Sequence, residues 1–366
     1  MEMSQASSGT APGLRIPSVR LVAENKDVLD SLGPLAELAG TWKGKGFNLI
    51  ARPDKEQNAN LFLELNQTRE TLEFNPISSS IPNRGFLQTD IQLFGLTYLQ
   101  QITDAVTGGA LHIEPGIWVT VQPTDAPSEP QSVARMATIP HGNAMLAPGS
   151  AIVVPSVPTP LNLSAGVFPS FNTAPFGIGG GVQPAGTLGG FPQYDLSNAA
   201  SATNPRTPFG DVPPIPLPAD IDGVPMQDVV QDPILLLQKI LTDQAANGHT
   251  IEKMTVLNIA TTTSVNFAKV AGPGGALLPP VSMPLSDGGV ENLPFLVTNA
   301  DVGTVYATFW IEKVIHPVFP PFMQLQYAQM VFLNFPILNP GSPAPPKPIV
   351  LTWPHLSVAT LRKAFG

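Results

Sequence analysis

Apolar and polar residues alternate over several stretches of the chain, as is typical of half-buried β-strands. Between residues 61 and 73 the apolar residues Leu61, Leu63 and Leu65 occupy every second position. The same pattern predicts further strands at 71–74, 96–102, 111–122, 132–139, 255–268, 303–314 and 323–335. Turn clusters separate these runs with little helix between them, for example at 75–76, 107–109 and 287–289. Such short connections predict antiparallel pairing.

These strands predict an all-β fold, an antiparallel up-and-down β-barrel of about eight to ten strands, because closing the sheet removes its exposed edges. A barrel of that size also leaves room for one small ligand. Three helices are expected beside it. Residues 31–40 form a short helical turn closed by Gly40, and residues 232–246 form an amphipathic helix. A C-terminal helix is expected from Trp353-Pro354 to about Phe365, with Pro354 at its first position.

We expect a flexible N-terminal tail over residues 1–30 and a single barrel domain over 31–366, interrupted at about 156–250 by a long Pro/Gly-rich insertion. The region from 136 to 194 contains no charged residue but many apolar ones, unlike a solvated linker. Its composition leaves two alternatives. The insertion is a structural flap that covers the barrel or mediates self-association, or it is a lid that closes a pocket.

Composition excludes several classes of function. The 366 residues include 42 prolines and 32 glycines but only 12% charged residues, so much of the backbone is irregular. The formal net charge of −9 disfavours nucleic acid and anionic membranes as partners. The absence of cysteine excludes disulfides, thiolate nucleophiles and cysteine metal sites. We see no secretory signal and no apolar run long enough to span a membrane, so a cytoplasmic location is expected.

The candidates for chemistry are the five histidines, His112, His141, His249, His316 and His355. No metalloprotease motif, phosphate-binding loop or dinucleotide fingerprint accompanies them. His355 is distinctive because it would lie in the first turn of the expected C-terminal helix. The positive end of a helix dipole keeps a histidine neutral, and the neutral imidazole is the form that binds iron. From these residues alone, His355 is more simply interpreted as an ordinary surface or core histidine than as an iron ligand.

Three segments resemble nitrobindin, a haem-binding β-barrel family distantly similar to lipocalins and fatty-acid-binding proteins. They are the opening strand at 38–46 with Gly40-Thr41-Trp42, the His112-Ile113-Glu114-Pro115-Gly116 strand, and the closing segment Pro354-His355-Leu356 onward. The resemblance covers roughly 31–155 and 250–366. It implies a haem b whose iron is bound by His355, with His112 near the haem pocket. It also implies an open distal site for nitric oxide, peroxynitrite or peroxide-type ligands.

The resemblance leaves the activity open between simple binding, peroxynitrite isomerisation and a peroxidase-like reaction. A peroxidase-like reaction needs a distal acid–base group, which His112 or His141 could supply. Two other residues are candidates for contact with the cofactor. Trp42 is most often a core plug under the closed end of such a barrel. Arg84 is either a solvated turn residue or the partner of a haem propionate.

Two rival hypotheses remain. In one, the barrel binds no haem and is a lipocalin-like carrier, or an enzyme, for an apolar small molecule capped by the insertion. In the other, the insertion is an assembly surface that makes the protein a homo-oligomer with a structural role.

Overall fold

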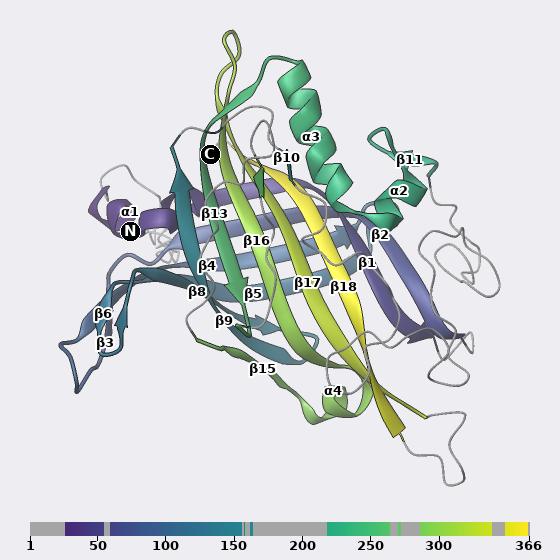
Figure 1. Ribbon diagram of the computed structural model, residues 1–366, viewed down its shortest axis with the longest axis horizontal. Coiled ribbons are helices and arrows are strands. Elements are labelled where there is room, and N and C mark those ends of the chain that lie inside the picture. Colours follow the sequence, from purple (N-terminus) through teal and green to yellow (C-terminus); the bar gives the residue numbers. More distant parts are fainter. Residues whose placement is uncertain are drawn as a thin grey trace, which may run out of the picture.

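The computed structural model of the chain is shown in Figure 1. It describes residues 26–54, 59–155, 157, 162–163, 218–263, 270–271, 286–338 and 348–364. Most of the expected N-terminal tail and much of the expected insertion, including 164–217, lie outside these residues. The proposed division into a tail, a barrel and an insertion therefore stays a prediction.

A closed antiparallel barrel of 10 strands forms the body of the protein (Figure 1). Each barrel strand pairs with the next in chain order, and the last pairs with the first. The strands are β1 Gly40–Asp54, β2 Ala59–Pro76, β4 Ile91–Asp104, β5 Ala110–Val121, β8 Ser132–Ile139, β9 Asn143–Val154, β13 Thr250–Ala260, β16 Asp301–Ile315, β17 Phe322–Leu338 and β18 Pro348–Lys363. This order confirms the predicted up-and-down barrel.

Short elements decorate the barrel. β3 (Ile81–Asn83) pairs with β4, and β15 (Gly289–Asn292) pairs with β9. Three two-stranded pairs are β6 Thr124–Asp125 with β7 Ser128–Glu129, β10 Asn162–Leu163 with β14 Val270–Ala271, and β11 Asp220–Ile221 with β12 Val224–Pro225. The helices are α1 Lys26–Ser31, the 3-10 helix η2 Gly33–Leu38, α2 Met226–Gln231, α3 Ile234–Ala246 and α4 Pro294–Asn299. None of the described helices has the length and apolar character needed to cross a bilayer.

The expected C-terminal helix is wrong, because the segment from Pro348 to Lys363 is strand β18. β18 lies between β17 and β1 and closes the barrel. Pro354, which suggested a helix start, pairs with Phe332 of β17, whereas the pairing with β1 begins only at His355. The proline therefore lies where the strand has no partner on the β1 side, a position that tolerates a missing N–H group.

The apolar residues form two cores, one inside the barrel and one outside. The inner core begins at η2, where Leu35, Leu38 and Trp42 are buried and close one end of the barrel. The outer core covers the outward faces of several strands and includes residues of α2 and α3. Along β18 the two faces alternate, with Ala359 and Leu361 in the inner core and Leu356 and Val358 in the outer one.

The helix predicted at 232–246 is confirmed as α3. Ile234, Leu237 and Leu241 are buried on one side of it and belong to the outer core. Figure 1 shows α3 lying on the outside of the barrel near β18. The described part of the expected insertion therefore packs on the barrel wall.

Candidate functional site

A cavity of about 330 Å³ lies inside the barrel, further along β1 than the plug residue Trp42. It is lined by inward-facing residues of several strands. On β1 these are every second residue, Asn48, Ile50 and Arg52. Leu296 of α4 also lines it. The walls hold many apolar side chains, as is usual for ligand pockets.

His355 enters this cavity from β18, where it lies opposite Ile50 of β1 and Val331 of β17. Its Nε2 lies 3.4 Å from the Ser357 hydroxyl, which faces the same side of the strand. Burial is the main cause that lowers the pKa of His355 to about 3, and the charges of His112 and His141 lower it further. The imidazole is therefore neutral at physiological pH, as the sequence predicted, although the cause is burial and not a helix dipole.

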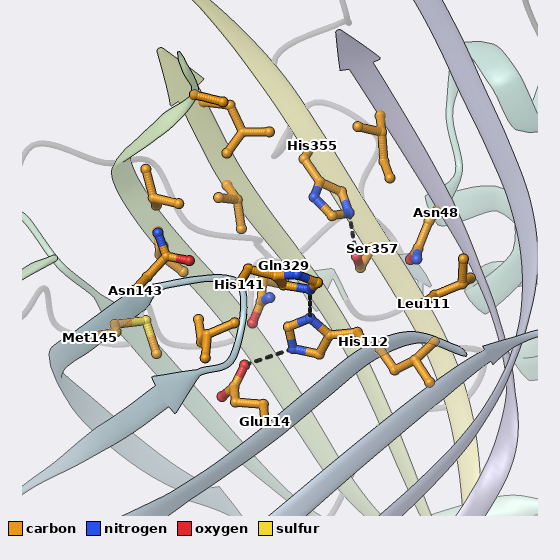
Figure 2. Close-up of a pocket in the computed structure, with 18 of the residues that line it drawn as sticks. Asn48, Leu111, His112, Glu114, His141, Asn143, Met145, Gln329, His355 and Ser357 are labelled. Atoms are coloured by element: carbon orange, nitrogen blue, oxygen red, sulfur yellow. Dashed lines mark hydrogen bonds and ion pairs between the residues drawn. The ribbon is translucent and has the colours of Figure 1, made fainter. Parts of the chain in front are cut away.

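Figure 2 shows His112 and His141 in the same cavity, with their rings together on the side away from β18. Nδ1 of His112 lies 3.3 Å from Nε2 of His141, and Nε2 of His112 lies 3.2 Å from a carboxylate oxygen of Glu114. Because an ionised carboxylate only accepts hydrogen bonds, His112 donates from Nε2 to Glu114. In the neutral ring, Nδ1 is then the acceptor toward His141.

Glu114 belongs to a buried charged network beneath the histidines. Arg135 donates to Glu114 and, at 2.9 Å, to the Tyr98 hydroxyl, while its Nη1 donates to Gln329 at 2.8 Å. Burial alone would raise the pKa of Glu114, but the Arg135 guanidinium and the bond from His112 outweigh it and lower the pKa to about 2. Glu114 is therefore a fixed anion under His112.

A second buried carboxyl group lies nearby in the barrel interior. Glu70 accepts hydrogen bonds from Tyr327 at 2.6 Å, Thr68 at 3.0 Å and Gln100 at 3.4 Å. Burial raises the pKa of Glu70 despite these donors. Tyr327 and Gln100 also line the cavity, so this network and the Glu114 network together form its polar floor.

Arg52 is the only lysine or arginine among the described residues that line the cavity. Its Nε donates to Glu64 at 2.8 Å, and its guanidinium lies 5.1 Å from the centre of the Phe62 ring. His141 is exposed and also lines the cavity, so the cavity reaches the surface there.

The structure brings together three of the residues selected from the sequence, His355, His112 and His141. Trp42 and Arg84 do not line the cavity. Trp42 is fully buried at the closed end and donates to the Leu38 carbonyl at 2.6 Å. Arg84 is exposed and forms an ion pair with Asp90. Within the described ranges, there is no cluster of three or more His, Asp or Glu residues that could hold a metal ion.

Sequence reasoning missed Arg52 and the buried network. Arg135 is buried and points inward from β8, on the same face as Val133 and Ala137. The alternation along β8 assigns all three residues to one face. A charged residue on an apolar face was the signal that could have indicated a buried ion pair.

No family model matches the sequence, and no curated protein matches it. One similar solved structure is the crystal structure of Rv2717c from M. tuberculosis, with 12% identity and a TM-score of 0.34, covering 92% of this chain and 98% of that chain. Another is the CymD monoaromatic hydrocarbon channel, with 10% identity and a TM-score of 0.13, covering 92% of each chain. Both TM-scores are too low to support a common fold or function, so the barrel assignment rests on the strand pairing of this chain.

Proposed function

We propose that this barrel binds haem b through His355 and leaves the opposite side of the cavity open to a small ligand. The observation that supports the proposal is a neutral imidazole facing a largely apolar cavity. A neutral histidine is the form that ligates iron, and apolar walls favour a porphyrin. Three side chains on the cavity wall close to His355, Ile50, Val331 and Leu333, could pack against it.

The other residues of the cavity fit such a cofactor in part. Arg52 is a better partner for a haem propionate than Arg84, because Arg52 lines the cavity and Arg84 does not. The volume of about 330 Å³ lies at the lower end of the range of about 300–1,000 Å³ for ligand pockets. The proposed haem would therefore be enclosed only in part.

His112 and His141 would act as the acid–base group of the open side. Haem iron held by one histidine keeps one coordination position for a diatomic or peroxide-type ligand. The Glu114 carboxylate accepts a hydrogen bond from Nε2 of His112, which leaves Nδ1 to accept a proton from the bound ligand or from Nε2 of His141. This arrangement supports peroxynitrite isomerisation or a peroxidase-like reaction as the activity to be tested.

Titration with hemin tests the binding proposal. Wild-type protein should give a sharp Soret band at a stoichiometry of about one haem per chain, and His355→Ala should lose it because alanine has no atom that can bind iron. His141→Ala is the matched control, since it removes a histidine from the same cavity without touching β18. Circular dichroism must show the barrel in all three proteins. Equal hemin binding by His355→Ala would refute the assignment.

A second candidate function is the binding of a small apolar molecule without haem, and the modest cavity volume favours it. This alternative predicts that hemin does not bind specifically to the wild-type protein. It also predicts that Leu296→Trp, which fills the cavity from α4, abolishes the binding of an apolar fluorescent probe. A Soret band that depends on His355 would reject this candidate.

A further inference from the structure

A groove of about 750 Å³ lies outside the barrel, separate from the histidine cavity. One wall is formed by the outward faces of β18, β1 and β2. The other wall is formed by α3 and the segment around β11, which lie outside the barrel in Figure 1. None of the described residues that line the histidine cavity also lines this groove, so the two spaces are separate.

Four basic side chains lie together on the barrel side of the groove. Lys43 of β1 is directly opposite Arg362 of β18, and Lys45 of β1 is directly opposite Arg69 of β2. Lys43 and Lys45 are two residues apart, so they share one face of the strand. All four are exposed. Like charges directly opposite each other across strands destabilise a sheet, so this arrangement has a cost to stability.

The acidic residues nearby compensate for these charges only in part. Lys45 lies 4.0 Å from Asp222, and the Arg362 guanidinium lies 4.1 Å from the centre of the Phe322 ring. Within the described part of the chain, the side chains of Lys43 and Arg69 have no ion-pair partner. A protein with 27 acidic and 18 basic residues thus concentrates uncompensated positive charge at one groove.

The α3 part of the facing wall is apolar, whereas Asp220 and Asp222 line the part around β11. Leu236, Leu237 and Ile240 of α3 line the groove, and Val358 of β18 lines it from the barrel side. Asp220, which also lines the groove, accepts a hydrogen bond from the Gly223 backbone. An occupant that complements both walls carries an anionic group and an aliphatic chain.

We propose that this groove binds an organic anion with an aliphatic tail, of the alkyl carboxylate class. The carboxylate would lie among Lys43, Lys45 and Arg69, where charge-assisted hydrogen bonds are strong. The tail would lie along Leu236 and Ile240 of α3. The ligand would relieve the repulsion between the paired cations when it binds.

Calorimetric titration with octanoate tests the proposal, with 1-octanol as the uncharged probe of equal chain length. Octanoate should bind the wild-type protein, and its affinity should fall as salt rises because exposed charges are screened. Lys43→Gln/Arg69→Gln should weaken octanoate binding on the order of tenfold, since two solvent-exposed charge contacts are lost. The double variant should melt no lower than wild type, because it removes like-charge repulsion.

Two controls separate the groove from other sites. Arg84→Gln/Lys313→Gln makes the same change in net charge away from the groove and should leave octanoate affinity unchanged. His355→Ala alters only the cavity and should also leave it unchanged, so this proposal and the haem proposal can fail independently. Loss of octanoate binding in His355→Ala, no binding to the wild type, or equal binding by Lys43→Gln/Arg69→Gln would each overturn the proposal.

Discussion

At the scale of single residues, the buried pair of Arg135 and Glu114 determines how the cavity floor is charged. Both side chains are almost fully enclosed, with exposed fractions of 3% and 1%. The pair is completed by Tyr98 and Gln329, which satisfy further donors of the guanidinium. Because Glu114 stays ionised, it orients His112 by accepting a hydrogen bond from its Nε2.

Arg135→Leu should destabilise the protein by about 3–5 kcal/mol, because it leaves the Glu114 charge buried without a partner. Urea denaturation at pH 7 measures this change. Arg84→Leu is the matched control: it removes an arginine from an exposed ion pair and should change the free energy of unfolding little. Equal effects of the two substitutions would contradict the network described here.

Much of the site could be predicted residue by residue, and the rest could not. His355 and His112 were selected because the segments around them resemble a known family, and His141 because it could supply an acid–base group. All three line one cavity. Arg52 and Arg135 were not assigned to the interior, because a period of two shows which residues share a face but not which charges meet across a barrel.

At the scale of elements, the segment that carries His355 shows how tertiary pairing overrides a local signal. Trp353-Pro354 is compatible with a helix start, but Val358 and Thr360 are β-branched. The apolar residues of this segment also divide between the two faces of a strand, with Leu356 and Val358 in the outer core and Ala359 and Leu361 in the inner core. Two neighbouring strands supply hydrogen-bond partners on both sides. The strand predicted at 132–139 agrees with β8, since alternation there meets no competing signal.

Contact between α3 and the barrel buries a further carboxyl group, Glu312 of β16, which is fully buried. Its Oε2 accepts from Gln324 at 2.6 Å, and Gln324 accepts from Gln244 of α3 at 2.6 Å. Burial raises the pKa of Glu312 to about 8, and the Gln324 bond offsets this only partly. The folded protein therefore keeps this proton up to about pH 8, whereas the unfolded chain releases it above its ordinary pKa of 4.5.

Stability should accordingly fall as pH rises from 4.5 toward 8, because the unfolded state binds fewer protons there. Glu312→Gln should remove this dependence and raise the free energy of unfolding at pH 8, on the order of 3 kcal/mol, with little effect at pH 4. Urea denaturation at pH 4 and pH 8 measures the free energy of unfolding of both proteins, and Glu291→Gln, at an exposed position, is the control. A variant less stable than wild type at pH 8 would contradict the assignment.

At the scale of the whole molecule, the barrel has a filled end, a cavity end and a covered outer wall. The strands that complete the ring, β9 and β13, are far apart in sequence, yet Val154 lies opposite Met254. The up-and-down order could be predicted from alternation and turns. The outer core could not be predicted, because the apolar residues that face α2 and α3 are of the same types as those that face the barrel interior.

The central claim is that the His355 imidazole is the protein's ligand to haem iron. The most direct measurement is the absorption spectrum of His355→Gly mixed with hemin, with and without added imidazole, because the glycine leaves space where the ring was. We predict that the variant lacks the Soret band of the wild type and that imidazole restores it, while His141→Gly keeps the band without imidazole. A wild-type spectrum in His355→Gly before imidazole is added would contradict the account.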